Sequence, residues 1–552
     1  MKILLFNLIL LINFVFISNS VAANKNNLAK VGDYIIAEIS SQANDYDTAN
    51  QYYLNLLKKD KKNTGLIIKI IKNNLLNEKI QLANKHYLKL EKIGCPKTEI
   101  ECINFTQSIG PLLTGVTYLK KNRTNRAIKA FSKIKNINNN KVYAELVRAW
   151  SLANFYTYKD SIEILDSINS EKNIDDIIMH KALIYDLVNE VELADIFYQQ
   201  SINSSKNINV INYYLNFLHR NNMEMEKNNF LQSLYADTSF EISINNEIFY
   251  NSRLVQNQIN GVGLVLYDAA QHLGFENIDL SRVILNIADY SYPDLYEVDF
   301  LSASLLHSLN LTDQAMKKYK LIPSNHYLSS IATIQLSNIL NLENLEEDAI
   351  ELLQNYLIEK DNFKVQMTLG DHFRYKSDWK NAQETYSKIL KNDKYILDPN
   401  IWNTYYRRGI SYERDKQWDL AERDFMQALE LNTNQPDVLN YLGYSWIDND
   451  INMLKAKIMI ELALEQKPDD AYFIDSLAWY YFKVSNYEQA DALLSYATYL
   501  APSDPVINEH YGDALWKVGK FIEARYQWNR ALDLDPEEDQ IEKIKVKLIK
   551  GY

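Results

Sequence analysis

The chain has 552 residues, a formal net charge of −12, and only 14 glycines and 10 prolines. Both counts lie well below average usage, which is about 7% for glycine and about 5% for proline, so few residues are available to break helices or to build long loops. The acidic balance argues against nucleic-acid binding, which needs a basic patch or stripe. Composition therefore favours an all-helical protein that does not bind nucleic acid.

Residues 1–22 have the features of a secretory signal peptide. Lys2 supplies a positive start, residues 3–17 are apolar apart from two asparagines, and the Ser-Val-Ala sequence at 20–22 matches a cleavage site of small residues. An uncleaved membrane anchor is the alternative, although the apolar run is short for a bilayer span of roughly 20 residues. We expect cleavage and a periplasmic mature protein, without a cysteine at its start to carry a lipid anchor.

Residues 23–235 carry a degenerate repeat. A small residue is followed about twelve residues later by alanine or serine, and four residues after that by a bulky residue. The steps from Ala49 to Ala83 and from Ala127 to Ser161 are both 34 residues. Because residues three and four apart share a helical face, each copy predicts two packed helices. The bulky positions of these copies are Tyr53, Tyr87, Phe131, Leu165 and Tyr198.

Cys95 and Cys102 lie in a stretch of ten extra residues within this array. Two nearby cysteines in an exported protein favour a disulfide. Two free thiols and half of a zinc site are the alternatives, but no histidine cluster lies nearby to complete a zinc site. We expect a disulfide that closes an irregular connection, with no redox role.

The period is lost around residues 236–261. We interpret this stretch as an irregular join between the N-terminal array at 23–235 and a C-terminal array at 262–536. Degenerate helices or a flexible linker would both fit the join.

The clearest copies lie between residues 402 and 536. The first reads Gly409, Ala421, Phe425 and Ala428, and the leading small residues of the four copies follow one another at intervals of 34, 35 and 34 residues. A period of about 34 residues is the signature of the tetratricopeptide repeat, a helix-turn-helix unit. We predict an all-α array of such hairpins forming a right-handed superhelix, an α-solenoid, with the bulky residues Phe425 and Trp528 in its core.

Residues 537–552 are predicted to form a capping helix. Charged residues from Glu537 onward alternate with apolar residues up to Leu548. Repeat arrays need a terminal element with a polar outer face to stay soluble.

Three motifs of the last copies carry a resemblance that goes beyond the repeat type. They are Tyr-Leu-Gly-Tyr-Ser-Trp at 441–446, Asp-Ser-Leu-Ala-Trp at 475–479 and Gly-Asp-Ala-Leu-Trp-Lys-Val-Gly at 512–519, followed by Trp528. With the signal peptide, this region resembles a family of long exported tetratricopeptide proteins of proteobacteria. That family is similar to an outer-membrane lipoprotein that serves as the adaptor of a periplasmic carboxyl-terminal processing protease. The missing lipid-anchor cysteine is a departure from it.

The resemblance implies a periplasmic scaffold that binds other proteins or peptides. Its partners would be a periplasmic protease, the substrates of that protease, or a cell-wall enzyme, with any membrane association made through a partner. An exported enzyme, or an enzyme subunit with a repeat region that binds substrate, is the alternative. The eight histidines are scattered and none lies in a known catalytic or metal-binding motif, so we expect no catalytic residue, no metal site and no cofactor.

The resemblance also implies a partner-binding groove lined by the first helix of each hairpin. Residues three before, one after and four after the leading small residue share one face, and that face mixes aromatic side chains with an amide and carboxylates, which suits a bound peptide. The alternative is that its aromatic residues only pack against neighbouring hairpins. We call these residues the predicted face: Tyr406, Ile410, Asn440, Tyr444, Asp475, Trp479, Phe482, Glu509, Asp513 and Trp516.

Overall fold

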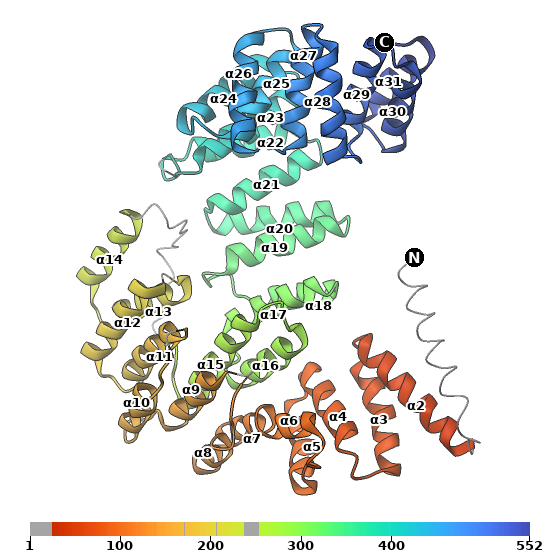
Figure 1. Cartoon of the computed structure of the whole chain (residues 1–552). Helices are drawn as coiled ribbons and strands as arrows, with labels where there is room; N and C mark the ends of the chain where they lie inside the picture. The colour runs from red at the N-terminus through yellow and green to blue at the C-terminus, as the bar shows by residue number, and fades with distance from the viewer. Residues whose placement is uncertain (1–24, 138–139, 171, 206, 237–252, 397) are drawn as a thin grey trace. The chain divides into compact units, whose positions relative to one another are not determined.

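The computed structural model describes the chain except for residues 1–24, 138–139, 171, 206, 237–252 and 397. The predicted signal peptide and most of the predicted join therefore lie outside the described residues. Within the described part every regular element is a helix, and one isolated bridge pairs Ile137 with Asn140 (Figure 1). The predicted all-α array of tetratricopeptide hairpins is confirmed.

The chain forms two compact units, residues 1–332 and residues 333–552. The first contains α2 (Lys25–Gln42), α3 (Tyr46–Lys59), α4 (Thr64–Leu76), α5 (Ile80–Ile93), α6 (Ile100–Thr106), α7 (Ile109–Leu119), α8 (Thr124–Phe131), α9 (Lys141–Leu152), α10 (Tyr158–Asp166), α11 (Ile174–Leu187), α12 (Val191–Ser205), α13 (Ile208–Arg220), α14 (Glu224–Ala236), α15 (Gln258–Leu273), α16 (Ile278–Ser291), α17 (Tyr296–Ser308) and α18 (Thr312–Tyr319).

The division falls inside α19 (Ser329–Leu342). The second unit continues with α20 (Glu346–Glu359), α21 (Phe363–Tyr375), α22 (Trp379–Leu390), α23 (Ile401–Arg414), α24 (Trp418–Leu431), α25 (Pro436–Asp448), α26 (Met453–Gln466), α27 (Ala471–Lys483), α28 (Tyr487–Leu500), α29 (Pro505–Lys517), α30 (Phe521–Asp533) and α31 (Glu538–Lys550).

Each clear hairpin is held by a small residue that faces a bulky one on the next helix. A Cβ atom at Gly409 would lie only 2.6 Å from the ring of Phe425, and one at Gly512 only 2.4 Å from Trp528. Phe425 and Trp528 are fully buried, which confirms that they are core residues. The repeat pattern therefore indicates a close crossing of the two helices. Because glycine has no side chain, the ring of the bulky residue can pack directly against its backbone.

The turn inside the hairpin has its own recurring geometry. In the turn after α19, Asn344 adopts a left-handed backbone conformation and the next amide, that of Leu345, bonds back to the carbonyl of Leu340. This is the Schellman ending of a helix. The same left-handed conformation occurs in the turns of eleven further hairpins, at Asn44, Glu78, Asn122, Asn189, Asn222, Asn310, Ser377, Lys416, Asp450, Ser485 and Gly519.

In the first unit the chain returns to its own earlier hairpins. Helix α15 packs against α9, and a Cβ atom at Gly261 would lie 2.0 Å from the indole of Trp150. Gln258 donates a hydrogen bond to the carbonyl of Ser151 at 2.6 Å, and Asn286 on α16 donates to the carbonyl of Leu75 at 2.9 Å. Helices α15 and α16 thus belong to the same compact unit as α2–α14, whereas we placed them in the C-terminal array.

Two further features bear on the predicted organisation. Cys95 and Cys102 are joined in a disulfide, with Cα atoms 5.6 Å apart, across the connection between α5 and α6. Among the described residues, none of the helices combines the length and the apolar character that crossing a bilayer requires.

Candidate partner-binding groove

The predicted face lies on the first helices of four successive hairpins in the second unit. Each helix ends in the turn described above. The starts of α27 and α29 are fixed by backbone N–H groups that donate hydrogen bonds to the carboxylates of Asp470 and Asp504. The small residues hold each first helix close to the second, and the predicted face lies on the adjoining side of the first helix. The face is distributed over α23 (Tyr406, Ile410), α25 (Asn440, Tyr444), α27 (Asp475, Trp479, Phe482) and α29 (Glu509, Asp513, Trp516).

The aromatic residues at the middle of the predicted face are buried. Trp479 is 8% exposed and its ring stacks on Phe482 at 4.8 Å and on His510 at 4.1 Å. Trp516 is half-buried and packs against Phe521 at 4.6 Å. For Trp479 and Phe482 this burial favours the packing alternative, because a side chain sealed between helices offers little surface to a partner.

His510 is a buried member of the face that the sequence pattern did not single out. Its Nδ1 atom lies 2.9 and 3.0 Å from the two carboxylate oxygens of Asp475. Burial alone would lower the pKa of His510, but the neighbouring Asp475, with Asp513 and Glu509, raises it above its ordinary value. The neighbouring carboxylates therefore favour the protonated form of this imidazole.

A second, partly buried ionic contact involves α31. Lys547 on α31 places its Nζ atom 2.7 Å from Glu509 and 2.6 Å from Asp513. Asp513 also accepts a hydrogen bond from the Trp528 indole at 2.9 Å. Burial raises the pKa of Asp513 to about 6, although Lys547 opposes the shift. The acidic residues of α29 therefore face a lysine from the same chain.

Residues 537–552, which we call the C-terminal segment, reach several parts of the predicted face. Glu537 pairs with Arg414 of α23 at 3.1 Å. The ring of Tyr552 lies 5.3 Å from Phe482, and Gly551 sits so close to Trp516 that a Cβ atom would be 2.1 Å from its ring. The C-terminal segment covers the part of the face formed by α27 and α29.

The other half of the predicted face is more open. Tyr406, Ile410, Asn440 and Tyr444 are all partly exposed. The buried amide oxygen of Asn440 has no hydrogen-bond partner among the described residues, which is unusual because buried polar atoms are almost always paired. This half presents apolar side chains that keep part of their surface exposed.

The structure thus brings the ten predicted residues onto one side of four adjacent helices but divides them into a covered and an open part. Sequence reasoning missed His510, Lys547, Tyr552 and Arg414. The lysine pattern of the last helix was visible, but nothing in the sequence indicated which carboxylates it would meet.

Comparison with known proteins agrees with the repeat type. A tetratricopeptide repeat-containing protein of Pseudomonas aeruginosa is 23% identical over 209 residues, which cover 37% of this chain and 33% of that protein. The chain therefore matches about a third of the length of this curated relative. No protein-family model matches the chain.

Two solved structures also align with the chain, at low TM-scores. A tetratricopeptide repeat protein of Parabacteroides merdae aligns with a TM-score of 0.39 and 15% identity, covering 46% of this chain and 99% of that one. The yeast protein Tom70 aligns with a TM-score of 0.33 and 12% identity, covering 95% of this chain and 96% of that one.

Proposed function

We propose that this protein is a non-catalytic scaffold of the bacterial cell envelope that binds other proteins through the open half of its predicted face. In this proposal it is exported, and it presents substrates to a periplasmic protease or organises envelope assembly. The resemblance of the closing repeats to exported adaptor proteins supports export and the presentation of substrates. The geometry of the second unit supports the binding of other proteins through the open half of the predicted face.

The observation that carries the proposal is the C-terminal segment lying on the predicted face. There, Glu509 and Asp513 hold a lysine, and Phe482 contacts a tyrosine ring. Both are side-chain interactions of the kind that bind a peptide in a groove, with aromatic contact for affinity and charge pairs for register. A face that binds the C-terminal segment through aromatic contacts and charge pairs can bind a peptide of another protein beside it.

The open half supplies what a neighbouring peptide needs. Ile410 and Tyr406 offer apolar surface, and the partly exposed side chains of Asn440 and Tyr444 add polar groups beside it.

A site-specific photo-crosslink tests the proposal. A photoreactive phenylalanine analogue replaces Ile410 on the open half in the full-length exported protein, and the native envelope is irradiated. We expect a discrete crosslinked envelope protein, identified by mass spectrometry. A second protein with the analogue at Leu454, which is 68% exposed on α26 and outside the predicted face, is the matched control. Equal crosslinking at both positions, or none at Ile410, would contradict the proposal.

A further inference from the structure

The C-terminal segment is attached to the second unit in two different ways. Within α31, Ile544 is fully buried in the cluster that contains Leu515 and Trp528. This helix is therefore part of the packing of the last hairpin. Gly551 and Tyr552 follow the helix and contact a different surface, the part of the predicted face on α27 and α29.

Gly551 directs the chain onto the predicted face. Its φ angle is 81°, a conformation that favours glycine, and its amide donates a hydrogen bond to the carbonyl of Lys547 at 2.8 Å. A Cβ atom at this position would lie 2.1 Å from the ring of Trp516, so the backbone of residue 551 packs directly on the indole. The turn places the ring of Tyr552 next to Phe482, with the ring centroids 5.3 Å apart.

The ring of Tyr552 has one aromatic and two cationic neighbours. It meets Phe482 edge to face, at an interplanar angle of 78°, which is a preferred arrangement of aromatic pairs. The Nζ atoms of Lys517 and Lys547 lie 4.8 and 4.9 Å from its centroid, within the range of cation–π interactions. All of these contacts are made by the ring, so a phenylalanine or tryptophan side chain can make them as well.

Tyr552 is held less firmly than the aromatic residues beneath it. It is 46% exposed, compared with 5% for Phe482 and 8% for Trp479. Edge-to-face and cation–π contacts of a half-exposed ring are individually weak, and they do not fill the core around Ile544. Tyr552 can therefore leave its position while α31 stays docked.

A series of rings connects the position of Tyr552 with the open half of the predicted face. From Phe482 it continues to Trp479 at 4.8 Å, to His510 at 4.1 Å and then to Tyr444 on α25 at 6.4 Å. Tyr444 belongs to the open half. Because each step is at most 6.4 Å, a short extended peptide can reach both the open half and the position of Tyr552.

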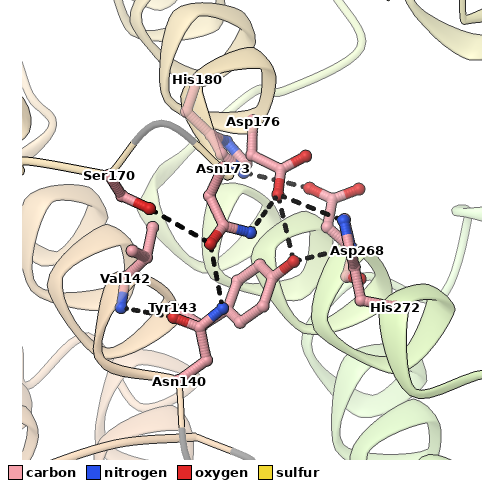
Figure 2. A network of polar contacts seen from close by, with 9 residues as sticks. All are labelled: Asn140, Val142, Tyr143, Ser170, Asn173, Asp176, His180, Asp268 and His272. Atoms are coloured by element: carbon pink, nitrogen blue, oxygen red, sulfur yellow. Dashed lines mark hydrogen bonds and ion pairs between the residues drawn. The ribbon is translucent and has the colours of Figure 1, made fainter.

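The first unit contains a comparable position that is permanently covered. Trp150 on α9 corresponds to Trp479, since each comes one residue after the small residue of its copy. Trp150 is covered by Gly261 of α15, and beside it the buried side chain of His180 on α11 lies 3.0 Å from the buried carboxylate of Asp268 on α15 (Figure 2). That cover is a complete helix with buried polar contacts, whereas the cover in the second unit ends in a half-exposed ring.

We propose that the position of Tyr552 is a subsite for an aromatic side chain of a partner peptide. The inference rests on the proposed function: a peptide bound to the open half places a phenylalanine, tyrosine or tryptophan against Phe482, near Lys517 and Lys547, and Tyr552 moves out. Until then Tyr552 competes with the partner for the subsite and weakens its apparent affinity. The partner segment that fits this face therefore carries an aromatic residue.

Peptide binding to the purified full-length protein tests the subsite. The probe is a peptide with the sequence of residues 549–552, capped at both ends and titrated by ligand-observed NMR. We expect at least about fivefold tighter binding to Tyr552→Ala than to the original protein, because the competing ring is absent. The same peptide with alanine in place of tyrosine should bind both proteins equally weakly. Equal affinity of the tyrosine peptide for both proteins, or no saturable binding to the variant, would overturn the proposal.

Two variants are the matched controls for this titration. Tyr552→Phe keeps the ring, and Tyr499→Ala removes a tyrosine that is 78% exposed on α28, outside the predicted face. Both should bind the peptide like the original protein. The melting temperature of Tyr552→Ala should be nearly unchanged, since Ile544 still docks α31. A marked fall would show that Tyr552 is a structural part of the cap and would overturn the proposal.

Crosslinking from Ile410 in the native envelope connects the subsite with the partner. When Tyr552→Ala is added, we expect the yield of crosslinked partner to rise about threefold or more, and with Tyr552→Phe it should stay the same. An unchanged or lower yield with Tyr552→Ala would overturn the proposal. Absence of any crosslink, together with tighter binding of the peptide to Tyr552→Ala, would overturn the proposed function and still support the aromatic subsite.

Discussion

Gly409 and Phe425 are packed so closely that a single added methyl group has a measurable cost. A Cβ atom at 409 would lie 2.6 Å from the Phe425 ring, which must shift within a fully buried site. We expect Gly409→Ala to lower the free energy of unfolding by about 1–2 kcal/mol, because overpacking outweighs the better helix propensity of alanine. Urea denaturation followed by circular dichroism measures it.

Gly32→Ala is the control for this substitution. Gly32 also lies within a helix, α2, but a Cβ atom there would meet nothing within 4 Å. We expect this change to raise stability by up to about 1 kcal/mol. If both variants were stabilised, the close crossing at Gly409 would not be the reason for the glycine.

Lys416, in the turn between α23 and α24, has an unfavourable backbone conformation. Its φ angle is 60°, in the left-handed region where a Cβ atom is unfavourable by roughly 1–2 kcal/mol. We expect Lys416→Gly to raise the free energy of unfolding by about 1 kcal/mol in the same assay. Asn310→Gly, at an equivalent turn with φ 58°, is the comparison and should gain less, since asparagine tolerates this conformation better.

His326 gives the first unit a dependence on acid. Burial lowers its pKa to about 4, whereas an unfolded histidine titrates near 6.5. Below pH 6.5 His326 binds a proton in the unfolded chain but stays neutral in the folded chain. The contribution of the neutral His326 to the free energy of unfolding is therefore complete above pH 6.5 and is lost as the pH falls toward 4. We expect a loss of about 2 kcal/mol between pH 7 and pH 5.

Urea denaturation at a series of pH values measures this effect. His326→Asn keeps an acceptor for the Leu328 amide, which bonds to the His326 ring at 3.3 Å, and removes the titrating group. The variant should lose a correspondingly smaller amount of stability between pH 7 and pH 5. An unchanged pH profile would show that other groups are responsible.

Single residues were predictable from the sequence to the extent that the repeat constrains them. Gly409 and Phe425 are recognisable because their spacing recurs in every clear copy. The turn residues are not, because Asn344, Lys416 and Ser377 occupy positions where glycine would have been the recognisable signal. The left-handed conformation is imposed by the hairpin and not by the residue type.

Among the elements, α31 is docked by the buried Ile544 and by one partly buried lysine. Lys547 is the ammonium group that pairs with Glu509 and Asp513, which are 6% and 0% exposed. We expect Lys547→Met to destabilise the docking of α31 by about 3 kcal/mol, because removing one partner leaves buried carboxylates unpaired. Hydrogen exchange at the α31 amides, monitored by NMR or mass spectrometry, reports this local opening.

Lys545→Met is the matched control on the same helix. Lys545 pairs with Glu542, and the two side chains are 54% and 76% exposed. A surface pair of this kind contributes about 1 kcal/mol or less, so exchange in α31 should hardly change. Similar acceleration in both variants would mean that loss of a charge from α31, and not the buried contact, controls its docking.

The helices themselves were predictable because a 34-residue period fixes where each face must lie. Their contacts with distant elements were not. The sequence placed Glu509 and Asp513 on one face of α29, but only the folded chain shows that Lys547 covers them. The period of the sequence determines on which face of its helix a residue lies. It contains no information on which residues of other elements contact that face.

For the whole molecule, export and the disulfide are linked predictions. We expect the mature protein to begin near residue 23 or 24 and to occur in the periplasmic fraction. We also expect Cys95 and Cys102 to be unreactive toward thiol reagents until their disulfide is reduced. Intact-mass measurement checks both points. Retention of Met1 would show that residues 1–22 form an uncleaved membrane anchor.

Loss of this disulfide should be moderate in effect. The bridge closes a loop with a sequence separation of 7 residues, for which the chain-entropy relation gives about 2–3 kcal/mol of stabilisation. We expect the double variant Cys95→Ala, Cys102→Ala to lose about this amount in urea denaturation under oxidising conditions. In the presence of a reductant the variant and the original protein should become nearly equal.

Trp150 on α9 is covered by Gly261 on α15, and this fixes an order of events during synthesis. A simple repeat array can acquire structure one hairpin at a time as the chain emerges, because each hairpin needs only its neighbours. Here α9 is complete more than a hundred residues before its cover exists, so closing the first unit requires a long loop and is intrinsically slow. Until α15 has been synthesised, the face of the Trp150 indole that Gly261 covers is an apolar surface on an unfinished chain.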